Sequence, residues 1–174
     1  MSERKTLFET KWLGIYRIGD WDFACRPHAP TAVGILAITP EDEIILIEQF
    51  RIPLQRRVIE IPAGIVGDEP EHIGEPLEET ARRELLEETG YDATGMKLLI
   101  ETPTTAGMSS ELIYLFQATG LTKTGEGGGI GSEDITVHKI PLKQLRQWLK
   151  DRQFEGLLVD HKIPSALWLA GIAG

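Results

Sequence analysis

Three absences narrow what this chain of 174 residues can be. A single cysteine, Cys25, excludes an internal disulfide and favours a reducing compartment, and we interpret it as a small, at least half-buried side chain rather than a nucleophile. No apolar run approaches the ~20 residues that a membrane-spanning helix requires. The first five residues, MSERK, lack the apolar core of a signal peptide. We therefore expect a cytoplasmic protein that does not bind membranes.

Basic residues are also scarce relative to acidic ones. The chain has 18 lysines and arginines against 27 aspartates and glutamates, which gives a formal net charge of −9. Affinity for nucleic acid rests on Lys and Arg contacts to phosphate, so this balance disfavours a nucleic-acid partner. The composition, 41% hydrophobic and 26% charged, is that of a globular protein long enough for one sizeable core. A small molecule is the partner that we expect.

The acidic residues gather most densely in residues 83–90, which read RELLEETG. On a helix, Glu84, Glu87 and Glu88 fall within about 100° of one another. Glu87 and Glu88 also lie in the last turn before Gly90, where the helix carries partial negative charge and like charges repel. A bound divalent cation would reverse both penalties, and carboxylate oxygens suit magnesium, manganese or calcium. Such ions would also let an acidic protein bind a phosphate-rich substrate.

Charge alone leaves a second interpretation open, because Arg82 and Arg83 are able to neutralise a solvated, Glu-rich surface helix. The spacing favours the metal site. Glu75 is followed by seven residues, then Arg-Glu, two residues, Glu-Glu, one residue and Gly. This pattern resembles the C-terminal part of the Nudix box. The resemblance implies a hydrolase that cleaves a nucleoside diphosphate linked to another group.

The chain departs from this family at the start of the box, where a glycine stands six positions before the first glutamate. Glu69 occupies that position here. The plausible opening glycine is Gly64, so the loop that follows it is five residues longer than usual. Turn-forming residues fill the segment 65–74, and an insertion in a surface loop costs little closure entropy. We expect the path of this loop to differ and the carboxylate helix to be retained.

The rest of the chain reads as a mixture of strands and helices. Strands are expected at residues 32–38, 43–50, 58–61, 97–101, 112–118 and 135–140, with a hairpin or strand pair at 11–23. Helices are expected from the Gly74-Glu75-Pro76 start to about Thr89, and at residues 141–149 and 164–172, the last apolar on most sides. The glycine-rich stretch 125–131 is expected to be a flexible loop. These elements predict an α/β sandwich.

The Nudix resemblance makes that fold more specific. It implies an α/β/α sandwich with a mixed sheet over residues 31–174 and a separate N-terminal β-hairpin region at residues 1–30. Further segments are similar to the ADP-ribose pyrophosphatase branch of the family: EQFR at 48–51, EIPAG at 60–64, Pro103 with Gly107 and Glu111, SEDI at 132–135, and DHK at 160–162. That branch implies hydrolysis of ADP-ribose to AMP and ribose 5-phosphate with Mg²⁺ or Mn²⁺, by a homodimer. Another nucleotide-sugar substrate such as GDP-mannose, or a non-catalytic nucleotide-binding module, remains an alternative.

The resemblance also implies roles for the residues of the box. Glu84, Glu87 and Glu88 would hold the metal ions, and the backbone carbonyl of Ala63 would add a ligand. Arg83, together with Glu75, would orient the helix and its carboxylates for catalysis. The water that attacks phosphorus would lose its proton to a carboxylate on a mobile loop. Glu133 is the first candidate for this base and Glu126 is the second.

Residues outside the box would bind the substrate. Arg51 would pair with a phosphate through its planar fork, and Arg56 and Arg57 are weaker candidates for the same contact. Glu60 would contact the adenine or ribose, or brace Arg51, and Glu111 would also face the substrate. Trp12 or Trp21 would stack on the base, in a site that the N-terminal strands of a partner subunit help to build. Packing in the core or at the dimer interface is an equal alternative for both tryptophans.

Overall fold

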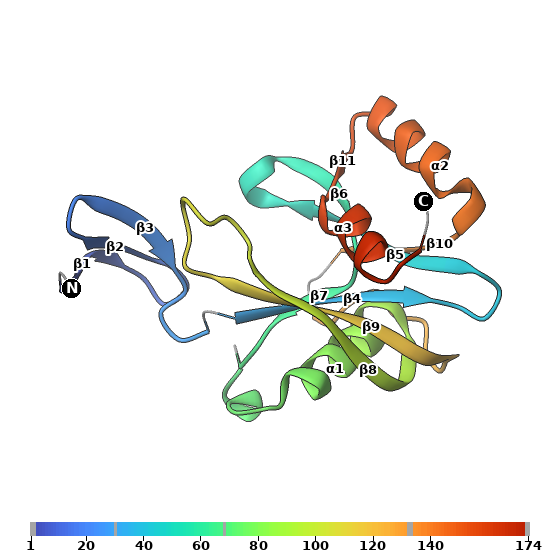
Figure 1. The fold of residues 1–174 in the computed structure, drawn as a ribbon, viewed down its shortest axis with the longest axis horizontal. Coiled ribbons are helices and arrows are strands. Elements are labelled where there is room, and N and C mark those ends of the chain that lie inside the picture. Colours follow the sequence, from blue (N-terminus) through green and yellow to red (C-terminus); the bar gives the residue numbers. More distant parts are fainter. Residues whose placement is uncertain (1–2, 30, 68, 132–133, 173–174) are drawn as a thin grey trace.

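The computed structural model describes residues 3–29, 31–67, 69–131 and 134–172, and it divides into a small sheet and a larger sheet flanked by helices. Figure 1 shows the small sheet extending from one end of the body that contains the larger one. Within the described residues, no helix combines the length and the apolar character needed to cross a membrane.

The small sheet is antiparallel and is built from β1 (Arg4–Glu9), β2 (Gly14–Ile18) and β3 (Trp21–Cys25). The predicted hairpin corresponds to β2 and β3, whereas β1 was not predicted. Every residue of β1 is exposed, so this strand has no buried face to leave an apolar pattern in the sequence. The backbone of Ala24 anchors the sheet to the loop after β8, because its N–H donates to the Met108 carbonyl at 2.8 Å.

The larger sheet has eight strands. Its strand directions are mixed, as predicted. Its main order is β11-β6-β5-β4-β9-β8, with β10 paired to β5 and β7 paired to β4. The β4–β9 and β6–β11 pairs are parallel and the other pairs are antiparallel. The strands are β4 (Thr31–Ile38), β5 (Glu43–Arg51), β6 (Arg56–Glu60), β7 (Ala63–Ile65), β8 (Tyr91–Pro103), β9 (Leu112–Lys123), β10 (Ile135–Pro141) and β11 (Leu158–Val159).

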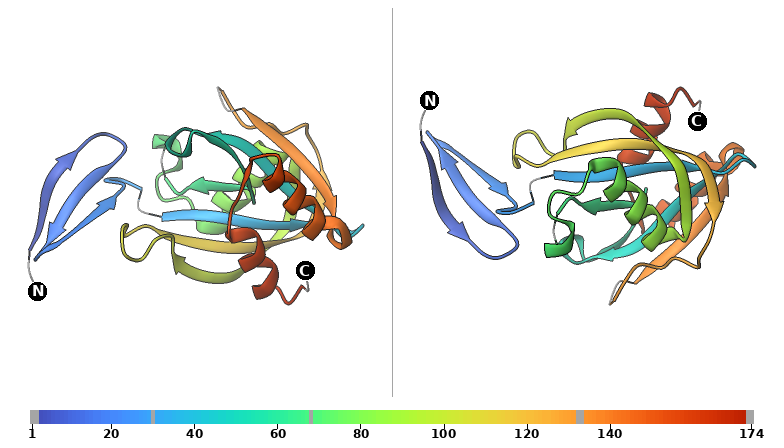
Figure 2. Two further views of the ribbon diagram at one scale, coloured as in Figure 1. Left: turned by 90° about the horizontal axis from the view of Figure 1, so that it is seen from above. Right: turned by 90° about the horizontal axis from the view of Figure 1, so that it is seen from below.

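The helices cover both faces of this sheet. Helix α1 (Leu77–Thr89) lies on one face, and α2 (Leu142–Phe154) and α3 (Lys162–Leu169) lie on the other (Figures 1 and 2). Two short 3₁₀ helices, η1 (Ile52–Leu54) and η2 (Pro70–His72), lie in connecting segments. The predicted α/β/α sandwich is therefore confirmed.

Two hydrophobic clusters fill the spaces between sheet and helices, and β4 contributes to both. Val33, Ile35 and Ala37 belong to the cluster that contains residues of α1. Leu36, between them, belongs to the cluster that contains residues of α2 and α3. The alternation is the one expected for a strand that is buried on both faces. Cys25, in the small sheet, is buried as predicted.

Several predicted boundaries were wrong. Helix α2 continues five residues beyond its predicted end, and α3 begins two residues early, with Pro164 in its first turn. Trp168 of α3 is 79% exposed, so this helix is less enclosed than its apolar sequence predicted. Residues 62–64 lay outside every predicted strand, but Ala63 and Gly64 pair with β4 as part of β7.

The glycine-rich stretch is a loop, and part of it is hydrogen-bonded to helix α1. The N–H groups of Gly128 and Gly129 donate to the carbonyls of Glu88 and Glu87, at 2.8 and 3.0 Å. This segment is therefore packed against the C-terminal end of α1.

Candidate active site

Helix α1 ends where its sequence predicts. Gly90 adopts a left-handed conformation, with φ of 72°, and its N–H donates to the Leu86 carbonyl at 2.7 Å. This is the usual cap by which glycine ends a helix. Because the helix stops there, Glu87 and Glu88 are fixed in its last turn.

Arg83 gathers the carboxylates of α1. Its Nη1 lies 2.9 Å from Oε1 of Glu84 and 3.0 Å from Oε2 of Glu87, and its Nη2 lies 3.3 Å from Oε2 of Glu75. The hydroxyl of Thr80 donates to that same Glu75 oxygen at 2.9 Å. Burial acts to lower the pKa of Arg83, but the charge of Glu84 and the contacts with Glu75 and Glu87 outweigh it and raise the pKa. The structure thus joins the predicted positioning pair to two predicted metal ligands.

Glu88 and Glu84 lie against β7. Glu88 is only 4% exposed, and the N–H of Ala63 donates to its Oε2 at 2.9 Å. A Cβ on Gly64 would lie 2.0 Å from the carboxyl carbon of Glu84. Any larger residue at this position would displace the Glu84 carboxylate, which explains why glycine stands here despite the lengthened loop.

Glu84, Glu88 and the residues of β7 line a cavity of about 350 Å³. Five predicted site residues line it, namely Arg51, Ala63, Glu84, Glu88 and Glu111, with Arg26, Ala32, Gln49, Gly64, Ile65, Thr104, Ile113 and Lys162. Strands β4 and β5 pair only beside the turn that joins them, at residues 37–38 and 44–45. Away from that turn β4 pairs with β7 and β5 pairs with β6, and this separated region supplies Ala32, Gln49, Arg51 and the three residues of β7 to the lining.

Arg51 brings positive charge to the same cavity. Its Nε donates to Oε2 of the buried Glu60 at 2.7 Å. Burial acts to lower the pKa of Arg51, and the hydrogen bond and charge of Glu60 outweigh it, so the pKa is raised. Arg51 is therefore held charged and oriented, and the contact matches the bracing alternative for Glu60.

Comparison with known proteins identifies the fold and the family. The NUDIX domain model matches residues 28–158. The chain belongs to the NUDIX family. The predicted family is thus confirmed.

Curated relatives are similar to this Nudix chain over part of their length. It is 37% identical over 125 residues to the methanol dehydrogenase activator of Bacillus methanolicus, and 35% identical over 127 residues to the ADP-ribose pyrophosphatase of Bacillus subtilis. Each match covers 71% of this chain and 65% of the relative. A GDP-mannose pyrophosphatase of Enterobacter is 30% identical over 123 residues, which cover 66% of this chain and 61% of the relative. The chain therefore spans less than two thirds of the length of these relatives.

A solved structure shares the fold across nearly the whole chain. The crystal structure of an ADP compounds hydrolase superposes with a TM-score of 0.74 and covers 97% of this chain and 89% of its own. The two sequences are 22% identical, so this likeness supports the fold alone.

The donor set of the Nudix cavity fits a hard divalent cation. Glu84 and Glu88 line the cavity beside the backbone of Ala63, and all three supply oxygen. Glu87 is not among the described residues that line it, and its carboxylate shares the guanidinium of Arg83 with Glu84. A separate group, Glu69, Glu71 and His72, has possible ligand atoms within 4.8 Å of one another, but it belongs to the lengthened loop.

Other predicted residues lie apart from the Nudix cavity. Arg57 pairs with Glu48 at 2.5 Å and with Asp134 at 2.7 Å. Arg56 is exposed, and so is Glu126, whose carbonyl accepts from Lys123 Nζ at 3.2 Å. Glu133, the first candidate for the base, lies outside the described residues.

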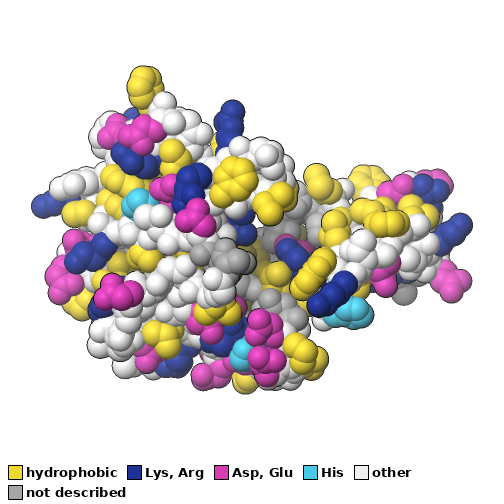
Figure 3. All heavy atoms as spheres, turned by 180° about the vertical axis from the view of Figure 1, so that it is seen from behind, with side chains coloured by type: hydrophobic (Ala, Val, Ile, Leu, Met, Phe, Trp, Pro, Cys, Tyr) yellow, Lys and Arg dark blue, Asp and Glu magenta, His cyan; other side chains and the backbone are white. Residues whose placement is uncertain are grey.

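The two tryptophans of the small sheet differ in their distance from the site. Trp12 is 63% exposed and lines a cavity of about 90 Å³ that shares Arg26 and Ile65 with the Nudix cavity. Trp21 is 64% exposed and lines neither cavity. Figure 3 shows many hydrophobic side chains on the surface of this sheet. Trp12 is therefore the better placed of the two for contact with a substrate.

Two cations in the cavity were not assigned a role from the sequence. Nε of Arg26 lies 2.9 Å from Oε1 of Glu111, and Nζ of Lys162 lies 2.5 Å from Oδ2 of Asp160. The DHK pattern at residues 160–162 was a signal for Lys162. Arg26 had none, because its place depends on how the small sheet meets the body.

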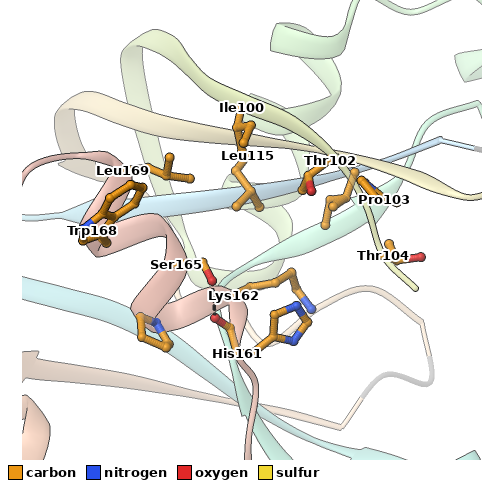
Figure 4. A pocket seen from close by; sticks show the side chains of 12 residues that line it. Ile100, Thr102, Pro103, Thr104, Leu115, His161, Lys162, Ser165, Trp168 and Leu169 are labelled. Carbon is orange, nitrogen blue, oxygen red and sulfur yellow. Dashed lines mark hydrogen bonds between the residues drawn. The ribbon is translucent and has the colours of Figure 1, made fainter. Parts of the chain in front are cut away.

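An apolar groove of about 510 Å³ adjoins the Nudix cavity, with which it shares Thr104, Ile113 and Lys162. Figure 4 shows it between β8 and α3, with Lys162 toward Thr104 and the ring of Trp168 near Leu169. The groove gives the charged cavity an apolar extension along the α3 side of the sheet.

Proposed function

We propose that this Nudix chain hydrolyses the diphosphate bond of ADP-ribose, giving AMP and ribose 5-phosphate, with Mg²⁺ or Mn²⁺. The observation that carries this proposal is the single cavity lined by Glu84, Glu88 and Arg51. A diphosphate needs neutralisation by metal ions and a guanidinium that fits its oxygens, and these residues supply the means for both. The names of the relatives from Bacillus subtilis and Mycobacterium tuberculosis, both ADP-ribose pyrophosphatases, support the choice of substrate.

In this proposal, Glu84, Glu87 and Glu88 hold the metal ions, with the carbonyl of Ala63. The bound ions would lower the pKa of the attacking water and neutralise charge on the phosphate oxygens. Arg83 positions the carboxylates, and Arg51, braced by Glu60, binds a phosphate. Arg26 and Glu111 form an ion pair on the cavity wall, with 2.9 Å between Nε and Oε1, and would contact the substrate there.

The reaction itself forms one bond and breaks another. Water attacks one phosphorus, its proton passes to a loop carboxylate, and the bridging P–O bond breaks so that the leaving phosphate departs with the bridging oxygen. We assign the base to Glu133, with Glu126 as the alternative. The Glu133→Gln variant should lose turnover and shift the acidic limb of the pH–rate profile, whereas an unchanged profile would reject the assignment.

We further propose that the chain divides into residues 1–30 and 31–174. The N-terminal part would form the interface of a homodimer. The small sheet exposes Phe8, Trp12, Leu13 and Trp21, and large exposed apolar patches mark interfaces. Trp12 would then meet the base. Light scattering tests the dimer, and Trp12→Ala should raise KM several-fold while Trp21→Ala should not. A monomer with equal KM in both variants would contradict this part.

A nucleotide sugar such as GDP-mannose is the second candidate substrate, because relatives named GDP-mannose pyrophosphatase are 30–32% identical. Release of nucleoside monophosphate should be measured across ADP-ribose, GDP-mannose and other nucleoside diphosphate compounds. We expect kcat/KM to be highest for ADP-ribose. Equal rates on every compound would defeat that substrate, and tight nucleotide binding without release would favour a binding module.

A further inference from the structure

The segment that follows β9 closes over the end of the metal-binding helix. Besides the bonds from Gly128 and Gly129 to Glu88 and Glu87, the N–H groups of Thr124 and Gly125 donate to the carbonyl of Gly90, at 2.9 and 3.0 Å. The last carbonyls of a helix have no partner within it. Here the backbone of a distant segment supplies those partners to Glu87 and Glu88, two of the three residues proposed to hold the metal ions.

Two glycines make this contact possible. A Cβ on Gly127 would lie 2.3 Å from the carbonyl carbon of Thr89, and one on Gly90 would lie 2.2 Å from the carbonyl oxygen of Gly125. Both neighbours are backbone atoms, which cannot rotate away as the end of a side chain can. Gly131, in the same stretch, has a similar left-handed φ of 65°, and no atom of the described residues lies within 4 Å of its Cβ position. The packing, and not only the backbone conformation, therefore requires Gly127.

Lys123 adds positive charge at the same place. Its Nζ donates to the carbonyl of Thr89 at 2.8 Å. The C-terminal end of a helix carries partial negative charge, so an ammonium group and several N–H donors stabilise it there. They also offset part of the cost of placing Glu87 and Glu88 in the last turn.

We propose that residues 123–129 form a clasp that positions the last turn of α1, and with it Glu87 and Glu88, for metal binding. The inference rests on the proposed metal-dependent function. Metal ligands must be held within about 0.5 Å of their productive positions. The clasp holds the backbone of Glu87 and Glu88 at the C-terminal end of α1, while Arg83 orients the carboxylates.

The sharpest test compares Gly127→Ala with Gly131→Ala, because both place a Cβ at a left-handed residue and only the first meets backbone. Binding of Mn²⁺ to the substrate-free protein is measured by electron paramagnetic resonance. We expect Gly127→Ala to weaken it about 10- to 100-fold, as loss of supporting contacts at a metal site does. Gly131→Ala should stay within about twofold of the wild type. Equal affinity in the two variants would overturn the proposal.

Two further measurements cover a Gly127→Ala protein that fails to fold. Hydrogen exchange on the unaltered protein should show the amides of Gly128 and Gly129 protected, and exchange at the rate of an open loop would contradict the clasp. Lys123→Met, which adds no atom against the helix backbone, should weaken Mn²⁺ binding several-fold, and unchanged binding would count against the clasp.

The same experiments separate the clasp from the function on which it rests. A wild-type protein that binds Mn²⁺ but releases no AMP from ADP-ribose would overturn the proposed reaction and leave the clasp standing. A wild-type protein that binds no divalent cation would overturn both.

Discussion

Helix α1 is flanked by two glycine-bearing segments that serve it in opposite ways. The segment before its N-terminal end contains Gly67 and Gly74, and within the described residues a Cβ on Gly74 would meet no atom within 4 Å. The clasp, which follows β9 in the chain and packs on the C-terminal end of α1, contains Gly127, where a Cβ would strike the helix backbone. At the N-terminal end of α1, which we call the open end, glycine permits an unusual backbone conformation. At the C-terminal end, which we call the enclosed end, glycine is required because a side chain would not fit.

This difference explains where the chain tolerates extra residues. The five-residue lengthening lies at the open end, in a surface loop whose closure costs little entropy. At the C-terminal end of α1, Glu88 accepts from the N–H of Ala63 through its side chain and from the clasp through its backbone carbonyl. An insertion there would separate groups whose distances the proposed chemistry requires.

The most damaging change should be Glu88→Gln at the enclosed end. Glutamine keeps an oxygen that accepts from the N–H of Ala63, so the fold should survive, but it removes the charge that would bind metal. We expect kcat to fall by more than the ~100-fold that loss of an outer contact causes at a metal site. Product release and circular dichroism measure the two effects. Wild-type turnover by this variant would refute the metal assignment.

A smaller loss of activity is expected from Gly64→Ala. This variant tests whether the missing side chain at Gly64 matters as much as the one at Gly127. The added methyl would displace the Glu84 carboxylate, and kcat/KM should fall about 10- to 100-fold. The cost should vanish in a Glu84→Ala background, because the two changes act on one contact. Additive losses in the double variant would show that Gly64 acts elsewhere.

The local features of α1 were predictable from the sequence, and its long-range contacts were not. The spacing from Glu75 to Gly90 predicted the helix, its end and its acidic face, because those depend on residues within a few turns. The role of Arg26 depends on a partner 85 positions away. The stretch that contains Gly127 was predicted to be flexible because the sequence shows only that glycine lacks a side chain. It does not show that the backbone of α1 occupies the space where a side chain would lie.

The smallest effect is expected from Gly74→Ala at the open end. Its φ of 84° is unfavourable for alanine, so stability should fall by about 1–2 kcal/mol, but no neighbour is displaced. The kcat/KM should therefore remain at the wild-type value while urea denaturation shows the loss. A fall in kcat/KM comparable to that expected of Gly64→Ala would mean that the segment before α1 also positions the carboxylates. The proposed difference between the two ends would then fail, because Gly74 would act through its backbone conformation without a packing contact among the described residues.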